Sequence, residues 1–281
     1  MSQPSPAEIA RKTVLFRLPG MDDATVRRDV EYARSDGSAL VLDLYLPAKE
    51  ALPGVVVLVA GYPEAGFRTI LGCASKEMGS SVSWARLIAA SGLAAVTYTN
   101  RRPEADLHTL VDFLRGNAGA LGVDASRMAL WATSGNGPLA VSLLMKETRE
   151  PLKCAALGYA YTLDPEGSDH VAQAARTWGF ANPCAGRSIA DVAADVPLFL
   201  ARAGHDQTPH LNEALDRFAA GGLARNLPIT LVNHPDAPHA FDLFDECETT
   251  REVIARVLSF LRFQLGASDA VESQPTARSS P

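Results

Sequence analysis

The chain has 281 residues, a formal net charge of −6 and a sequence pI of about 5.5, and 47% of its residues are hydrophobic. This length suits one large α/β domain or two small ones, and the hydrophobic fraction supports a sizeable core. No cluster of Lys and Arg occurs, which argues against nucleic acid as a partner. No run approaches the roughly 18 apolar residues that span a bilayer, so we expect no membrane segment.

The four cysteines are scattered and form no Cys-x-x-Cys pair. This pattern argues against a zinc site or a disulfide framework and favours reduced thiols, so we expect a cytoplasmic protein. Residues 1–13 are polar and charged, unlike a signal peptide. We predict a flexible leader over 1–20 and, because residues 266–281 are small and polar, a disordered tail there.

Between these ends, at 21–265, we predict one α/β domain in which strands and helices alternate. Strands at 26–33 and 39–45 flank a Ser-Asp-Gly-Ser turn, which predicts a hairpin. The run Gly-Val-Val-Val-Leu-Val at 54–59 is typical of a strand buried on both faces of a parallel sheet. Further strands are predicted at 94–98, 128–132, 154–161, 196–203 and 227–233, and helices at 83–90, 107–114, 138–146, 209–220 and 248–265.

A hairpin followed by repeated strand–helix units predicts a doubly wound, mostly parallel sheet of about eight strands, with helices on both faces and an antiparallel start. Two segments, 62–83 and 162–195, exceed the usual loop length, and long ordered loops in such folds are usually functional. We expect both at the carboxyl ends of strands, with 162–195 as a small cap or lid insertion. The last strand is a possible edge for homodimer formation.

The hexapeptide Ala-Thr-Ser-Gly-Asn-Gly at 132–137 lies between a predicted strand and a predicted helix. A serine on such a sharp turn, here Ser134, is how a hydroxyl is presented as a nucleophile, usually as Gly-x-Ser-x-Gly. Ala132 and Asn136 take the two glycine positions. Alanine is small, and asparagine is tolerant of the left-handed backbone that we expect at Asn136.

The same turn also fits another class of enzyme. Gly135-x-Gly137-x-x-Ala140 after a strand resembles a dinucleotide-binding fingerprint, which would make the protein an oxidoreductase. That hypothesis requires an acid about 20 residues on, at the end of the next strand. The first candidate is Asp164, which comes somewhat late.

A serine nucleophile needs a base and an acid that orients the base. Asp206 follows the predicted strand 196–203, and His239 follows the strand 227–233. Ser134, Asp206 and His239 therefore occur in the order Ser…Asp…His, each just after a strand. Asp236 and Asp242 flank the histidine and are predicted to be loop caps.

Other histidines are candidates for the base or for a metal site. His108 falls on a predicted helix, and His234 belongs to a strand end. The group His205, Asp206 and His210 suggests a metal, but no third ligand has a convincing spacing, so we predict no metal site.

Acyl transfer also needs donors for the developing oxyanion. We expect the backbone N–H of Gly135, directly after the nucleophile, to be one of them. We assign the other to the N–H of Tyr62, in the Gly-Tyr turn that leaves the strand at 54–59.

These segments, spread over about 25–265, resemble the α/β-hydrolase superfamily on its dienelactone-hydrolase-like and carboxylesterase side. The His-Ala-Phe stretch at 239–241 is similar to the His-Gly-Phe around that family's catalytic histidine, and the Gly-Tyr turn resembles the oxyanion loop of cutinase-like esterases. The resemblance implies a cofactor-free hydrolase with Ser134 as the nucleophile, Asp206 and His239 as its partners, and a small ester and water as substrates. Dienelactone hydrolases use a cysteine nucleophile, whereas the serine here points to ordinary esters.

The two long segments and the histidine loop carry several large apolar side chains, which suit a small uncharged, short-chain or aromatic ester. The predicted pocket residues are Phe67, Met78, Trp178, Phe180 and Phe241. A third hypothesis stays open beside the ester hydrolase and the oxidoreductase: a non-catalytic binding protein on the same fold.

Overall fold

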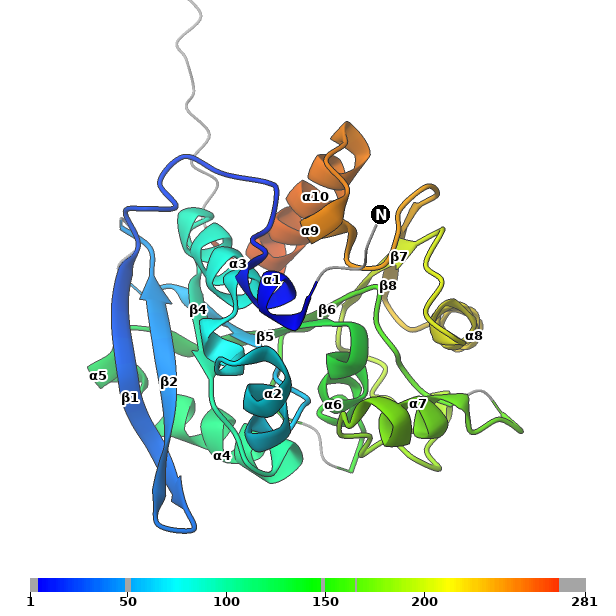
Figure 1. Cartoon of the computed structure of the whole chain (residues 1–281), viewed down its shortest axis with the longest axis horizontal. Helices are drawn as coiled ribbons and strands as arrows, with labels where there is room; N and C mark the ends of the chain where they lie inside the picture. Colours follow the sequence, from blue (N-terminus) through cyan, green and yellow to red (C-terminus); the bar gives the residue numbers. More distant parts are fainter. Residues whose placement is uncertain (1–4, 49–51, 148–149, 165, 268–281) are drawn as a thin grey trace, which may run out of the picture.

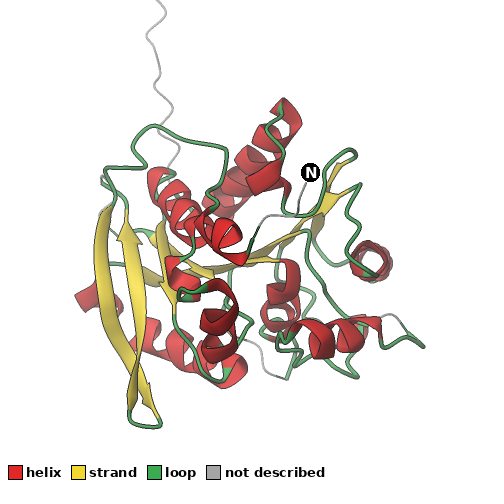
Figure 2. Cartoon of the chain, viewed as in Figure 1, coloured by secondary structure: helices red, strands yellow, loops and turns green. Residues whose placement is uncertain are grey.

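The computed structural model describes residues 5–48, 52–147, 150–164 and 166–267. These residues form one eight-stranded sheet with the strand order β1-β2-β4-β3-β5-β6-β7-β8 (Figures 1 and 2). Pairing is antiparallel for β1–β2 and β2–β4 and parallel from β4 to β8. The strands are β1 Thr25–Ser35, β2 Ser38–Leu46, β3 Gly54–Leu58, β4 Ala94–Tyr98, β5 Asp124–Thr133, β6 Cys154–Gly158, β7 Leu198–Ala203 and β8 Ile229–His234.

Helices cover both faces of the sheet (Figure 1). In β3, Val55 and Val57 pack into one core layer and Val56 and Leu58 into the other, because successive side chains of a strand point to opposite faces. One layer is covered by α4, α6 and α8, and the other by α3 and α10. The helices are α1 Pro6–Arg11, α2 Glu64–Leu71, α3 Gly79–Ala90, α4 Pro103–Gly116, α5 Ala118–Leu121, α6 Gly137–Ser142, α7 His170–Trp178, α8 Leu211–Ala224, α9 Phe241–Phe244 and α10 Glu248–Gln264, with short 3₁₀ turns at η1 Ser75–Glu77, η2 Ser134–Asn136 and η3 Ile189–Asp191.

The predicted fold class is confirmed, and each predicted strand and helix has a counterpart within a few residues of its expected bounds. The two long segments are not plain loops. The first, 62–83, contains α2, η1 and the start of α3, and the predicted cap or lid insertion at 162–195 contains α7 and η3.

The described part of the leader, which we predict to be flexible, packs on the domain instead. Ser5 caps α1 through a capping box with Glu8. Val14 is buried, and its N–H donates to Ser83 Oγ (2.9 Å) on α3. This segment packs on the domain because it buries apolar side chains that composition alone did not reveal. Of the predicted tail, 268–281 lies outside the described residues.

All four cysteines are free thiols. Among the described residues, no helix combines the length and the apolar character needed to cross a bilayer.

Candidate active site

Ser134 lies on a sharp turn between β5 and α6 and has φ of +54°, in the left-handed region. A non-glycine residue in that region costs about 1–3 kcal/mol and persists only where surrounding contacts hold it. Here the segment that follows β6 holds it, because Ser134 N–H donates to Tyr159 O (3.2 Å) and Tyr161 N–H donates to Ser134 O (3.1 Å). The serine is thereby fixed at the carboxyl edge of the sheet.

Close contacts leave little room for a side chain at the two glycines of this turn. A Cβ on Gly137 would overlap the carbonyl oxygen of Tyr161, and one on Gly135 would overlap the phenol oxygen of Tyr62. Asn136 is not left-handed as we expected, since its φ is −79°. The strain of the turn falls on the serine, and Asn136 contributes through its side chain.

Ser134, His239 and Asp206 form one hydrogen-bonded chain. Ser134 Oγ lies 3.0 Å from His239 Nε2, and His239 Nδ1 lies 2.7 Å from Asp206 Oδ2. The Asp206 side chain is fully buried, whereas one third of the His239 side chain is exposed. Burial raises the pKa of Asp206, but hydrogen bonds from His239 and Thr208 outweigh it and hold that pKa below its ordinary value. Asp206 is therefore suited to remain an anion beside the imidazole.

The loops that carry the acid and the histidine touch each other. Gly204 N–H donates to His234 O (2.8 Å), and a Cβ on Gly204 would overlap the carbonyl oxygen of Pro235. Glycine is needed here so that the loop after β7, which carries Asp206, can pass against the loop after β8. Ala240, directly after the histidine, has φ of +54°.

A buried group of hydrogen-bonded side chains packs against the His239 ring. The ring of Tyr159 packs edge-on against His239, with centroids 5.1 Å apart. Asp242 accepts hydrogen bonds from Tyr159 Oη and Trp84 Nε1, both at 2.7 Å. The prediction that Asp242 is a loop cap is therefore wrong. It is almost completely buried, and burial raises its pKa.

The loop after β3 lies against the serine turn. Asn136 Oδ1 accepts a hydrogen bond from Gly61 N–H (2.8 Å), and Ala60 O accepts one from Asn100 Nδ2 (2.8 Å). Within the described residues, the N–H groups of Tyr62 and Gly135 donate no hydrogen bond. These are the two donors that the sequence assigns to an oxyanion, and they lie on adjoining segments.

The five predicted pocket residues fall into two groups. Phe67 and Phe180 contact the Tyr62 ring, each with centroids 5.9 Å from it, and Phe180 is close enough to meet a Cβ on Gly135. These two lie beside the serine turn.

The other three have different surroundings. Trp178 is 57% exposed at the end of α7, and Met78 is half-buried before α3. Phe241 is buried in the core against Tyr159 and His234. A cavity of about 870 Å³ between the insertion and α8 is lined by none of the five predicted residues.

The alternative site residues that the sequence suggests have other partners. Asp164, the acid that the dinucleotide hypothesis needs, accepts hydrogen bonds from the N–H groups of Val171 and Ala172 at the start of α7. His234 is buried beside Thr250 and Asp245, and His108 pairs with Glu150 (2.7 Å).

The fold is shared with many solved structures. The chain is similar to a bacterial heroin esterase, with a TM-score of 0.65, 18% identity and 87% of this chain and 86% of that chain covered. An esterase from Rhizomucor miehei gives a TM-score of 0.65, 16% identity and coverage of 86% and 84%. A thermophilic esterase from Thermogutta terrifontis gives 0.60, 20% identity and coverage of 87% and 94%. No protein-family model and no curated protein sequence matches the chain.

The strand order, the turn at Ser134 and these similarities identify the fold. The chain has the α/β-hydrolase fold.

Proposed function

We propose that the protein is a serine carboxylic-ester hydrolase that works through an acyl-enzyme intermediate. The observation that carries the proposal is the hydrogen-bonded chain from Ser134 Oγ through His239 to the buried Asp206. Hydrogen bonds of 3.0 and 2.7 Å in that order match what a nucleophile, a base and an orienting acid require. The esterases among the similar structures support the same reaction class.

In the proposed mechanism, Ser134 Oγ attacks the ester carbonyl while His239 Nε2 takes its proton. Asp206 holds the ring so that Nε2 faces the serine, and its anion stabilises the imidazolium that forms. The backbone N–H groups of Tyr62 and Gly135 stabilise the negative oxygen of the tetrahedral intermediate. His239 then protonates the leaving alcohol, and a water activated by the same histidine releases the acid.

The proposed substrates are small, uncharged, short-chain or aromatic esters. Phe67, Phe180 and Tyr62 form an aromatic group beside the serine turn. Apolar linings with few polar groups suit ligands of this kind. The finer assignment to the dienelactone-hydrolase-like side rests on the sequence motifs.

The direct test is hydrolysis of p-nitrophenyl acetate and butyrate by the native chain and by Ser134→Ala, with Ser142→Ala on α6 as a serine control. We expect Ser134→Ala to lose on the order of 10³-fold or more in kcat/KM, because it removes the nucleophile. Equal, slow rates for both would reject the serine mechanism. Ligand binding without turnover would then favour a non-catalytic binding protein, and a nicotinamide fluorescence titration would detect the dinucleotide alternative.

A further inference from the structure

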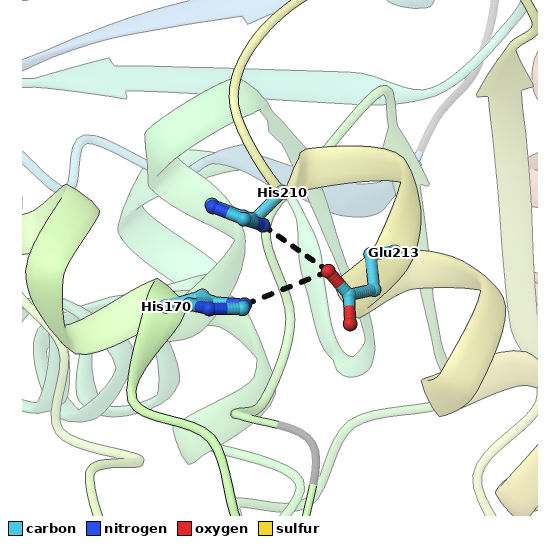
Figure 3. A group of neighbouring side chains, drawn as sticks. All are labelled: His170, His210 and Glu213. Carbon is cyan, nitrogen blue, oxygen red and sulfur yellow. Dashed lines mark hydrogen bonds and ion pairs between the residues drawn. The ribbon is translucent and has the colours of Figure 1, made fainter.

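Two histidines and a glutamate gather where α7 meets the start of α8 (Figure 3). His170 is the first residue of α7, His210 precedes α8, and Glu213 lies in the first turn of α8. Their ligating atoms all lie within 4.8 Å of one another. Both histidine rings turn a nitrogen toward the same carboxylate oxygen (Figure 3).

Two distances between these atoms are close to the separation of ligand atoms around a zinc ion. Glu213 Oε2 lies 3.1 Å from His210 Nδ1 and 3.5 Å from His170 Nδ1. A tetrahedral zinc ion with bonds of about 2.0–2.1 Å holds its ligand atoms about 3.3 Å apart. The second distance is too long for a good hydrogen bond. His170 Nδ1 is buried and has no hydrogen-bond partner among the described residues.

A supporting residue already orients the carboxylate. Arg217, one turn further along α8, contacts the other oxygen of Glu213, Oε1, at 3.0 Å. This leaves Oε2 directed at the two histidines. Partners of this kind, which fix a ligand in place, are typical of metal sites.

We propose that His170, His210 and Glu213 bind a divalent transition metal of the zinc class, with water as a fourth ligand. The sequence did not predict this because His205 and Asp206, the apparent partners of His210, are not part of the cluster. Asp206 instead binds His239. The missing ligand is His170, which comes from the distant insertion.

Binding requires one ring to turn. The two imidazole rings are stacked, with centroids 3.6 Å apart and planes 20° apart. Each nitrogen must direct its in-plane lone pair at the metal, so the rings cannot remain parallel. His210, whose side chain is 47% exposed, has room to tilt.

The proposed metal would tie the insertion to the loop that carries Asp206. Thr208 N–H donates to Asp206 Oδ1 (2.8 Å), and Tyr161 Oη donates to Pro209 O (2.7 Å). These hydrogen bonds link Asp206 to the residues just before His210 and link that segment to Tyr161. A metal at His210 would restrain this segment and α7 together. This inference does not depend on ester hydrolysis.

The test is calorimetric titration of the whole chain, stripped of metal with EDTA and desalted, with zinc chloride. We expect one zinc ion per chain and an increase in Tm on binding. His170→Gln, His210→Ala and Glu213→Gln should each weaken binding at least about tenfold. His108→Ala is the matched control, because it removes a histidine from the two-residue pair with Glu150 and should leave binding unchanged.

Titration with cobalt(II) gives a second readout on the unaltered protein. A four-coordinate site with nitrogen and oxygen ligands gives intense visible absorption, whereas cobalt bound weakly to surface groups does not. Absence of saturable zinc binding, or binding that persists in His170→Gln, would overturn the proposal. A cobalt spectrum without intense visible bands at one equivalent would overturn the four-coordinate site.

Discussion

Asn136 takes a position in the serine turn where α/β-hydrolases usually carry glycine. Its side chain accepts the hydrogen bond from Gly61 N–H and so links the turn to the loop that carries Tyr62. We predict that Asn136→Ala lowers kcat about 10- to 100-fold with a smaller effect on KM, because the proposed oxyanion donors would no longer be held in place. Steady-state kinetics check this, with Asn117→Ala, an asparagine at the end of α4, as the control. An unchanged kcat would mean that the loop is positioned without this contact.

Tyr62 offers two possible donors, its backbone N–H and its phenol. The phenol oxygen lies against Gly135, and burial raises its pKa to about 12, so it stays protonated at neutral pH. We assign the role to the N–H and therefore predict that Tyr62→Phe keeps kcat/KM within about threefold. A loss of 10²-fold or more in that variant would transfer the role to the hydroxyl. Tyr62→Ala, which also removes the ring from Phe67 and Phe180, separates packing from hydrogen bonding.

Asp242 predicts a particular dependence of stability on pH. Burial raises its folded-state pKa above the value of 3.8 expected for an unfolded chain. The folded protein thus binds this proton more tightly, and the stabilisation is present below the unfolded pKa and lost as pH rises through the folded pKa. Relative to Asp242→Asn, we expect the free energy of unfolding of the native protein to fall as pH rises from about 4 to 7. Urea unfolding of both proteins at several pH values measures this, and parallel curves would contradict it.

The main candidate residues were predictable because each lies shortly after a strand. Ser134 directly follows β5, Asp206 lies three residues after β7 and His239 lies five residues after β8, and a parallel sheet brings the ends of these strands to one edge. The support beneath them was not predictable in this way. Trp84 and Tyr159 reach Asp242 from other parts of the chain, and no spacing in the sequence links the three.

The helices α2 and α7 are absent from the sequence-based prediction, although both carry helix signals. The α2 helix has an Arg68–Glu64 pair one turn apart and ends at a left-handed Gly72. The α7 helix likewise ends at a left-handed Gly179. Both segments are predicted to be loops because they fall outside the regular alternation of strand and helix. The predicted strand 154–161 is also longer than the observed β6, because regular pairing stops at Gly158, where the chain turns toward Ser134.

The docking of the N-terminal segment depends on one glycine of α3. A Cβ on Gly79 would lie 2.6 Å from Lys12 O and 2.7 Å from Arg11 O. We predict that Gly79→Ala displaces this segment, makes it sensitive to trypsin near Lys12 and lowers the free energy of unfolding by about 1–3 kcal/mol. Gly116→Ala at the end of α4, where a Cβ would meet nothing within 4 Å, is the control. Unchanged cleavage in Gly79→Ala would show that the backbone adjusts without undocking.

The sheet as a whole brings candidate site residues from the ends of four strands to one edge. The Tyr62 loop follows β3, Ser134 follows β5, Asp206 follows β7 and His239 follows β8. This placement follows from parallel pairing, because parallel strands end on the same side. Strand β8 is one of the two edge strands of the sheet and carries an exposed Leu231. Homodimer formation through this edge stays a prediction.

In the proposed mechanism, Ser134 is a nucleophile activated by His239. The most direct measurement is covalent labelling with a fluorophosphonate, read by intact mass and peptide mapping, in the native chain, Ser134→Ala and His239→Ala. We expect one adduct per chain on Ser134, no adduct in Ser134→Ala and strongly slowed labelling in His239→Ala. No adduct on the native chain, or an adduct on another residue with Ser134 unmodified, would contradict it.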